Sequence, residues 1–404
     1  MGDTFGVRGS FPILADLTYL NTASVGLVPE PVIRKAHEFE ADLGARGTTG
    51  FDEDAETAVL EDARTAGARL LNAPQDNVAV ATSFTEALCQ IAWWLRPRAP
   101  QNVVSTEIDF PSVTYVWHRI AEETGVDVRL VPVLDDPQAF DIERLATFVD
   151  DATAVLCVSH VQYLTGHRLD LGELAELAHS HGAMLIADAT QSAGQVPIDV
   201  TASGVDVLIT GSYKWLCSTF GAALCYLSPT VLERFRPPFV GWRGTITPYD
   251  LDARWKELAP SARRMEFSTM SYAAAVALGA AINYILDLGA ERILLHNLEL
   301  TTRLIEGLDE LGATLLTPRD EDHRAGTVSA RFPESDGEQV AAELTRRGVI
   351  VSPRVGSTRF SAHFYNDGND LDRALDELSR VLMEHREVGR RGVASRARPP
   401  LGPD

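Results

Sequence analysis

Two short apolar runs near the middle of the chain constrain its fold more than any other feature. The first comprises residues 184–187, and the second covers residues 205–209 with one interruption, Asp206. Short apolar runs bounded by turn residues are typical of strands buried inside a sheet. In open α/β sheets the functional groups lie where such strands end. We therefore expect the polar residues that follow each run to mark a site.

Asp188 follows the first run. Lys214 follows the second run and lies 26 positions after Asp188 in the sequence. If the two strands are neighbours, both side chains emerge at the same edge of the sheet. A lysine at the end of a buried strand is desolvated, which lowers its pKa and makes its free amine a usable nucleophile. Such an amine can form a Schiff base with a carbonyl compound. The alternative is a structural ion pair between Asp188 and Lys214 at the sheet edge.

The overall composition is that of an ordinary soluble globular protein. The chain has 404 residues, of which 45% are hydrophobic and 23% are charged, and this length allows a large core and two domains. The formal net charge of −21 argues against a nucleic-acid partner and against an anionic membrane surface. No charged-then-apolar signal segment opens the sequence, and no apolar run reaches transmembrane length. We therefore expect a cytoplasmic protein.

Strand-like and helix-like patterns alternate over residues 77–226. This alternation predicts an α/β fold with a mainly parallel, doubly wound sheet. From about residue 291, two long helical patterns surround short strands at 327–332 and 349–352, which predicts a smaller second α/β domain. The tail from residue 388 is rich in Arg, Gly and Pro, so we expect it to be disordered.

The residues around Asp188 and Lys214 also carry a family resemblance. The pattern D-A-x-Q-x-x-G, which begins at Asp188, and the pattern S-Y-K-W, which contains Lys214, resemble the class V aminotransferase family. This family of fold-type I enzymes depends on pyridoxal 5'-phosphate (PLP). It includes cysteine desulfurases, kynureninase, isopenicillin N epimerase and the C–S lyase of ergothioneine biosynthesis. The resemblance extends from Tyr19 to about Leu382.

The resemblance implies a large PLP-binding domain with a sheet of the seven-stranded type and a small C-terminal α/β domain. It also implies a homodimer whose subunits share active sites, because some of the family's cofactor contacts come from the neighbouring subunit. The expected divisions are an N-terminal segment that lines the pocket (1–30), the large domain (31–255), a connecting helix (256–290), the small domain (291–387) and the tail (388–404).

The resemblance further implies roles around the cofactor. Lys214 would hold PLP as a Schiff base and then act as the base at the substrate Cα, while Asp188 would keep the pyridine nitrogen protonated. Phe110 would stack on the ring, and Gln191 would donate to its phenolic oxygen. The phosphate would be held by Phe84 through its amide, Thr85, Ser212, Tyr213, and Thr269 from the partner subunit.

Two of these phosphate contacts have structural alternatives. Residues 83–85 follow a predicted strand and open a helix, whose free amides form an anion site, but a plain N-cap by Ser83 or Thr85 fits the same residues. Thr269 ends the pattern R-x-E-x-x-T, and it fits a cap of the following apolar helix nearly as well.

Arg359 is the expected ligand of the substrate carboxylate, because Arg359-Phe360-Ser361 matches the family pattern and a guanidinium binds a carboxylate through two parallel N–H bonds. Arg354 and Arg243 are the next candidates. His160 could equally be a structural histidine. The other expected contacts with the substrate are Asn21, Ser24, His160, Gln162, Trp242 and Arg243.

The cysteine positions narrow the reaction. Desulfurases of this family carry a persulfide-forming cysteine just before the carboxylate-binding arginine, whereas residues 351–358 contain none. Cys217 and Cys225 follow Lys214 instead, and Cys89 and Cys157 lie in apolar surroundings typical of core positions. The patterns S-Y-K-W and S-H-V-Q-Y-x-T-G look most like the ergothioneine-type C–S lyases and their relatives in secondary metabolism. This resemblance implies a C–S lyase that acts by β-elimination on a cysteine S-conjugate. Decarboxylation with oxidative deamination, epimerisation and transamination remain open alternatives, and the scattered cysteines predict no metal site.

Overall fold

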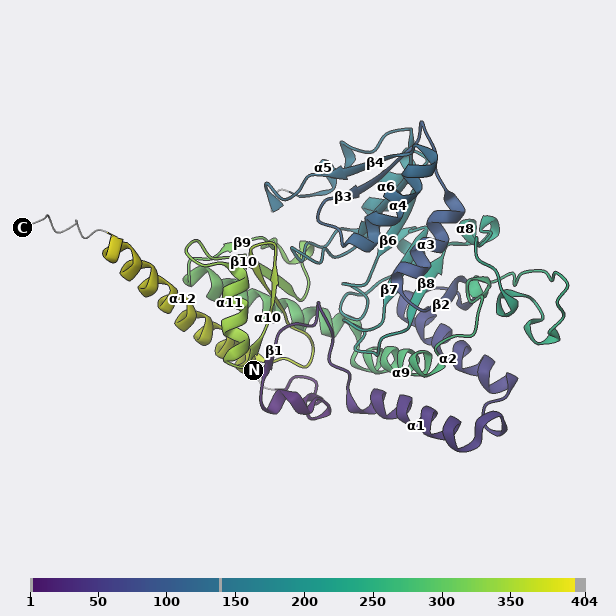
Figure 1. Cartoon of the computed structure of the whole chain (residues 1–404), viewed down its shortest axis with the longest axis horizontal. Coiled ribbons are helices and arrows are strands. Elements are labelled where there is room, and N and C mark those ends of the chain that lie inside the picture. Colours follow the sequence, from purple (N-terminus) through teal and green to yellow (C-terminus); the bar gives the residue numbers. More distant parts are fainter. Residues whose placement is uncertain (1–2, 138–139, 397–404) are drawn as a thin grey trace, which may run out of the picture.

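The computed structural model of the chain describes residues 3–137 and 140–396. The chain forms two lobes, a large one around a seven-stranded sheet and a small one around a four-stranded sheet (Figure 1). The large sheet has the strand order β2-β8-β7-β6-β5-β3-β4. Its strands are β2 (Val78–Ala81), β3 (Asn102–Thr106), β4 (Asp127–Val131), β5 (Thr153–Ser159), β6 (Met184–Asp188), β7 (Val207–Gly211) and β8 (Ala223–Leu227).

The large sheet is mainly parallel. Strands β7, β6, β5, β3 and β4 run parallel to one another, whereas β8 is antiparallel to both β7 and β2. Parallel neighbours need crossover connections, which are usually helices. The observed order confirms the predicted α/β fold of the fold-type I enzymes.

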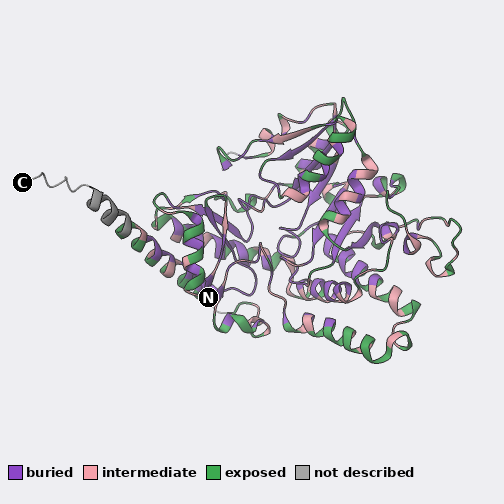
Figure 2. Cartoon of the chain, viewed as in Figure 1, coloured by how far each residue is buried: buried purple, intermediate pink, exposed green. Residues whose placement is uncertain are grey.

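Helices cover both faces of the large sheet, which explains the continuous apolar runs in the sequence. Successive residues of β6 pack into different cores, Leu185 into one and Ile186 into the other. Figure 2 shows the strands buried between helices whose outer sides are exposed. One core includes α2 (Glu53–Leu71), α6 (Leu171–Ser180) and α9 (Tyr272–Leu288), and the other includes α3 (Phe84–Leu95), α4 (Pro111–Thr124) and α8 (Pro229–Arg234).

The helix expected to connect the domains belongs to the large lobe. Ala274, Leu278 and Ile282 of α9 lie in the same core as α2, and α9 also packs against α1 (Glu30–Arg46). The chain then bends by 74° into α10 (Ala290–Glu310), which packs into the small lobe. Within the described ranges no single helix is long and apolar enough to cross a membrane, and α9 and α10 meet that length and composition only as a bent pair.

The small lobe contains an antiparallel sheet of order β12-β13-β10-β9. Its strands are β9 (Thr314–Leu315), β10 (Thr327–Arg331), β12 (Ser352–Arg354) and β13 (Ser357–Ser361), and α10, α11 (Gly337–Arg346) and α12 (Gly368–Arg396) pack against them. Helix α12 continues to Arg396, so the expected disorder from residue 388 is wrong up to that point. No proline interrupts this segment before position 399, which lets the helix continue. Residues 397–404 lie outside the described residues.

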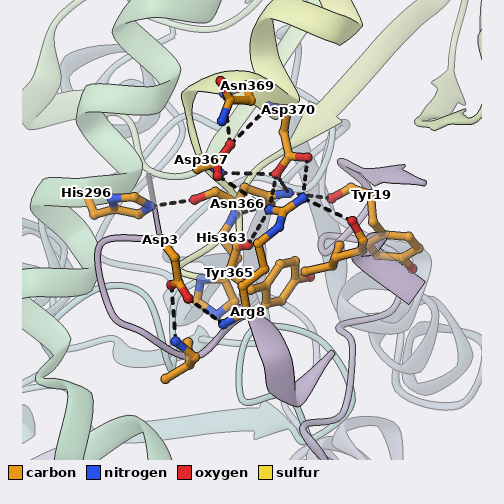
Figure 3. Close-up of polar contacts among 12 residues, drawn as sticks. Asp3, Arg8, Tyr19, His296, His363, Tyr365, Asn366, Asp367, Asn369 and Asp370 are labelled. Carbon is orange, nitrogen blue, oxygen red and sulfur yellow. Dashed lines mark hydrogen bonds and ion pairs between the residues drawn. The ribbon is translucent and has the colours of Figure 1, made fainter. Parts of the chain in front are cut away.

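The N-terminal segment is attached to the small lobe before it reaches the junction between the lobes. Arg8 donates hydrogen bonds of 2.7 and 2.9 Å to Asp370, and Asn366 donates to the Tyr19 carbonyl at 3.0 Å (Figure 3). Strand β1 (Thr18–Tyr19) pairs in parallel with β11 (Val349–Ile350). The short helices α5 (Ile142–Ala146) and α7 (Val200–Ser203) complete the α-helices of the described residues.

The segment after β1 packs against the turn that carries Lys214. Gly26 donates its backbone N–H to the Tyr213 carbonyl at 2.8 Å. A Cβ atom on Gly26 would lie 1.9 Å from the Lys214 carbonyl oxygen, so only glycine allows this approach. The N-terminal segment is thus held against the turn that carries Lys214, and its expected place in the lining of the pocket stays a prediction.

Candidate active site

Asp188 and Lys214 meet at one edge of the large sheet. Strands β6 and β7 are parallel neighbours with Asp188 opposite Ile209, so both chains leave the sheet on the same side. The two side chains line one hollow, as their positions after neighbouring strands predicted. The other residues that line it are Ser83, Phe84, Thr85, Phe110, Ser112, Ser159, Tyr163, Thr190, Gln191, Gly211 and Tyr213.

Lys214 is buried, with only 8% of its surface exposed. The pKa of its ammonium group is lowered from 10.5 to about 8, mainly by desolvation; Asp188 opposes this shift, and the charges of Arg359 and Arg354 add to it. Its Nζ atom lies 5.5 Å from the centre of the Phe110 ring. Lys214 forms no ion pair with any described residue, so the structural ion pair with Asp188 is not what the structure shows. The lysine instead resembles a nucleophile held in a partly apolar hollow.

Asp188 is also buried, and desolvation raises the pKa of its carboxyl group to about 6. Hydrogen bonds from Thr190 and the charge of Lys214 oppose this shift, and the backbone N–H of Thr190 donates to Oδ1 at 2.8 Å. At neutral pH the carboxylate therefore remains mostly ionised. It is an anion that can accept a hydrogen bond from a protonated ring nitrogen.

Phe110 stands on the wall of the hollow with 44% of its surface exposed. Tyr163 packs edge-on against it, with ring centres 5.5 Å apart. The turn before Phe110 is held by the buried Asp109, which accepts hydrogen bonds from Thr106 Oγ1 at 2.7 Å and from the Ser159 N–H at 2.8 Å. These contacts fix a largely open aromatic face, which is suited to stacking on a planar ligand.

Gln191 has a fixed orientation. Trp215 donates its indole N–H to Gln191 Oε1 at 2.7 Å, and Gln191 Nε2 donates to the Ala23 carbonyl at 3.0 Å. Since an indole can only donate, Oε1 must face Trp215. The amide group keeps a second N–H that can be donated within the hollow.

The predicted phosphate residues divide into two groups. Helix α3 begins at the hollow, with Ser83 as its N-cap accepting from the Glu86 N–H at 3.1 Å. Thr85 Oγ1 donates to Ser112 Oγ at 2.9 Å, so two hydroxyls stand beside the free amides of the helix start. Ser212 differs, because its hydroxyl is buried and donates to the Thr219 carbonyl at 2.6 Å. Its side chain does not line the hollow.

Arg359 lies next to the hollow and is fully buried. It donates to the Tyr163 carbonyl at 2.8 Å and to Ser24 Oγ at 2.7 Å, and its Nε atom has no hydrogen-bond partner. No described carboxylate forms an ion pair with it. Burial lowers the pKa of its guanidinium group to about 9. A buried cation without an anion is costly, and it is the feature expected of a site that binds an anionic ligand.

Ser24 and Asn21 reach this region from the N-terminal segment. Ser24 Oγ accepts from Arg354 Nη2 at 3.1 Å as well as from Arg359. Asn21 pairs with Ser361 through a parallel bridge, and its Oδ1 atom is buried without a hydrogen-bond partner. Ser24 therefore contacts the expected carboxylate ligand directly, and a role of either residue in binding the substrate stays a prediction.

His160 and Gln162 do not face the hollow. Ser159 lines it, whereas His160 lines a separate depression with Arg168, Leu169 and Asp170, because successive residues at a strand end point to opposite sides. Desolvation lowers the pKa of His160 to about 3, so it is neutral. Gln162 donates to Asp109 at 3.2 Å and supports the turn before Phe110. These side chains were predicted to contact the substrate, but the structure places them outside the hollow, in structural positions.

Trp242, Arg243 and Thr269 lie away from the hollow of their own chain. Arg243, in the short helix 242–244, is buried and pairs with Glu56 at 2.5 Å, which occupies its guanidinium. Trp242 packs against Tyr249 with ring centres 5.6 Å apart. Thr269 is exposed and lies in the loop before α9. Arg243 is thus corrected to a structural residue, and Trp242 and Thr269 contribute nothing to the hollow of their own chain.

No cysteine lines the hollow among the described residues. Cys217 and Cys225 are buried, Cys157 is buried in the core, and Cys89 is half-buried. Desolvation raises the pKa of the Cys217 thiol far above its usual range, which suppresses the reactive thiolate.

Several residues of the hollow were not predicted. Tyr163, Ser112 and Thr190 line it, and Asp109 holds its wall. Tyr163 was within reach of sequence reasoning, since it lies in the stretch S-H-V-Q-Y that follows strand β5. Ser112 and Thr190 are small hydroxyl side chains that carry no distinctive pattern, and Asp109 is a carboxylate that acts on the turn from outside the hollow.

The residues present fit PLP. A buried lysine without an ion-pair partner can bind the aldehyde, Asp188 lies across the hollow for the ring nitrogen, and the open face of Phe110 can cover the ring. The start of α3, with its free amides, fits a phosphate.

Comparison with known proteins agrees with this geometry. Residues 18–373 match the family model Aminotransferase class-V. The chain is 30% identical to the uncharacterized aminotransferase YcbU of Bacillus subtilis, over 92% of this chain and 96% of the relative. It is also 30% identical to a probable cysteine desulfurase of Synechocystis, over 93% and 95% of the two chains.

Solved structures show the same fold. A cysteine desulfurase from Thermococcus onnurineus superposes with a TM-score of 0.85 at 25% identity, covering 95% of this chain and 99% of that chain. The cystine C–S lyase C-DES, in complex with its product cysteine persulfide, superposes with a TM-score of 0.84 at 23% identity, covering 91% and 99%. Because the family model covers most of the chain, this protein belongs to the PLP-dependent class V aminotransferase family.

Proposed function

We propose that this enzyme is a C–S lyase that acts on a cysteine S-conjugate by β-elimination. The observation that carries the proposal is a buried arginine, Arg359, which has no described acidic partner and lies beside a hollow that contains Lys214 but no cysteine. An amino-acid carboxylate would supply the missing anion. The net reaction converts the S-conjugate and water into a thiol, pyruvate and ammonia.

The chain's own residues prepare this reaction. When bound, PLP supplies an electron sink for the carbanion that forms at the substrate Cα. Asp188 would hold the proton on the pyridine nitrogen, and Phe110 would cover the ring. Gln191 would donate to the phenolic oxygen, while Thr85, Tyr213 and the amide of Phe84 would hold the phosphate.

Lys214 and Arg359 act on the substrate. Lys214 Nζ would act as the base that takes the proton from the substrate Cα, and its lowered pKa suits that transfer near neutral pH. Arg359 fixes the carboxylate, and with it the rotation about the Cα–N bond that decides which bond at Cα breaks. Ser24 and Asn21 complete the wall on this side.

The absence of a thiol from the hollow argues against persulfide formation within the described chain, although cysteine desulfurases are among the relatives. Decarboxylation with oxidative deamination, epimerisation and transamination use the same residues, and they differ in the bond that is broken at Cα. Their products differ, so they can be distinguished by product analysis.

The assembly we propose is a homodimer in the cytoplasm. Phe239, Leu251 and Trp255 are exposed around the loop that carries Trp242, and this apolar surface fits a subunit interface. In such a dimer Trp242 and Thr269 would be available to the partner's hollow. Sedimentation of the PLP-loaded protein tests this, and an active monomer would contradict it.

The test of the reaction is a product balance. The PLP-loaded enzyme is incubated with S-ethyl-L-cysteine, and thiol, pyruvate, ammonia and carbon dioxide are measured together. Equal amounts of thiol, pyruvate and ammonia are expected. Carbon dioxide with an aldehyde, or inversion of the substrate without thiol release, would replace the lyase with one of the alternatives. When L-cysteine is supplied instead, formation of alanine and sulfide would indicate a cysteine desulfurase.

A further inference from the structure

A second arginine stands beside the proposed carboxylate ligand. In the β12–β13 pair, Ser352 lies opposite Arg359, and Arg354 lies opposite Ser357. Residues two apart on a strand share a face, so Arg354 and Arg359 are diagonal neighbours on one side of this sheet. Both donate to a single neutral acceptor, Ser24 Oγ, at 3.1 and 2.7 Å.

Arg354 has no anion of its own within residues 3–137 and 140–396. Its remaining hydrogen bond goes to the Pro353 carbonyl at 2.7 Å, and it is half-buried. Other arginines without an ion pair, such as Arg168 and Arg264, donate to several backbone carbonyls, whereas Arg354 has one carbonyl and the hydroxyl that it shares with Arg359. Two neighbouring cations that share one hydroxyl repel each other, and a bound anion would relieve the repulsion.

One substrate carboxylate cannot satisfy both arginines. An α-carboxylate carries a single negative charge, and Arg359, the deeper of the two, would take it. The phosphate site at the start of α3 is built from Thr85 and its neighbours, which are separate from the β12–β13 pair. Arg354 lies next to Val355, which is 59% exposed, so it stands closer to the surface than Arg359.

We infer that Arg354 binds a second acidic group carried by the substrate's side chain, so the substrate class is a dianionic amino acid such as an S-carboxyalkyl cysteine. The inference rests on the proposed role of Arg359 as the ligand of the α-carboxylate. The charge of Arg354 also reaches the reacting amine, because it contributes to lowering the pKa of Lys214. A second carboxylate bound there would reduce that influence as the substrate arrives.

The test compares two ligands of nearly the same shape, S-carboxymethyl-L-cysteine and its neutral amide, S-carbamoylmethyl-L-cysteine. Their Kd values for the PLP-loaded protein are measured by calorimetry at low and moderate salt. Wild type should bind the acid about tenfold more tightly than the amide or better, since a charge-assisted hydrogen bond is worth roughly that much. Salt should weaken the preference.

Arg354→Gln should reduce this preference to within about twofold while leaving affinity for the amide nearly unchanged. Arg346→Gln is the matched control, because Arg346 lies in the same lobe with 73% of its side chain exposed, and it should retain the wild-type preference. Equal binding of acid and amide by wild type would overturn the inference. Loss of both ligands in Arg354→Gln would also overturn it, by assigning Arg354 to the α-carboxylate or to folding.

Pyruvate release from the same ligands is recorded separately. A charge preference without pyruvate would contradict the proposed lyase reaction but leave the second anion site intact. Pyruvate release from both ligands, with equal Kd values for the acid and the amide, would support the proposed lyase reaction and contradict the second anion site. If neither ligand binds, both the amino-acid site and the inference fall.

Discussion

The strand ends of the large sheet and the loops around Trp242 and Thr269 were both predicted to contribute to the active site, but the structure holds them differently. Asp188 and Lys214 leave neighbouring parallel strands and line one hollow. Arg243, next to Trp242, forms an ion pair with Glu56, and Thr269 is exposed. One region lines the hollow of its own chain, and the other does not.

The difference shows which part of a site a sheet can fix. Hydrogen bonding between parallel strands sets the register, so residues at their carboxyl ends come together in every copy of the fold. A loop has no such constraint, and its position depends on contacts that are remote in sequence or supplied by another subunit. The predictions below separate these two regions, from the largest expected effect to the smallest.

The largest effect is expected at Lys214. Lys214→Ala removes both the amine that holds PLP and the base at Cα, so kcat should fall by at least about 10³-fold. The other contacts of the hollow should still retain PLP. The measurement is steady-state pyruvate release beside absorbance of the bound cofactor.

The chain offers its own control for this prediction, because it has only three lysines, Lys35, Lys214 and Lys256. Borohydride reduction of the PLP-loaded enzyme should modify Lys214 alone in peptide mapping. Lys35→Ala should keep full activity, since that side chain is 66% exposed. Adduct on Lys35 or Lys256 with none on Lys214 would remove the assignment of the site.

The next effect tests the other region. Arg243→Gln leaves Glu56 partly buried without its cation, and the free energy of unfolding should fall by up to about 3 kcal/mol. Affinity for PLP should change little, because Arg243 does not line the hollow of its chain. Thermal unfolding and PLP titration measure the two quantities, with Arg254→Gln as the exposed control. Lost PLP affinity at wild-type stability would return Arg243 to the active site.

Arg359 should show the opposite behaviour to Arg243. Arg359→Ala leaves the substrate carboxylate without its partner, and kcat/KM should fall thirtyfold or more, which is a loss of about 2 kcal/mol or greater. PLP absorbance should remain. Arg359→Lys should recover only part of the activity, because an ammonium group cannot make two parallel hydrogen bonds. Wild-type kinetics in Arg359→Ala would move the carboxylate site to Arg354.

Sequence reasoning succeeded where periodicity carried the information. The runs before Asp188 and Lys214 located two buried strands, and the alternation of patterns predicted the parallel sheet. It failed where one residue decides the direction of a side chain. His160 and Ser159 are adjacent at the end of β5, and a strand boundary known only to within a residue cannot say which of them faces the hollow.

Other failures came from contacts that no local pattern encodes. The pair between Arg243 and Glu56 spans 187 positions, and the hydroxyl of Ser212 is taken by a carbonyl seven residues away. Arg354 illustrates the reverse case. The sequence made it only a second candidate for binding the substrate carboxylate. The register of β12 and β13 places it diagonally beside Arg359 on the same face of the sheet.

The smallest effect concerns the protonation of Lys214. Only the free amine captures PLP, and burial lowers the pKa of Lys214 from 10.5 to about 8. The rate of PLP capture by the apoenzyme should therefore rise with pH through about 8, more than two units below the behaviour of an exposed lysine. Stopped-flow absorbance over a pH series measures this rate, with a lysine model peptide as the reference.

Arg354→Gln sharpens this last prediction, because it removes a positive charge that disfavours the ammonium form of Lys214. Without that charge the ammonium is more stable, so the pKa of Lys214 rises and the midpoint of PLP capture moves to higher pH. The shift should be small, since desolvation of Lys214 is the larger cause and is unchanged in the variant. Arg346→Gln, remote and exposed, should leave the midpoint where it is. A midpoint near that of the model peptide would show that Lys214 is hydrated, and a downward shift in Arg354→Gln would show that the two charges do not face each other.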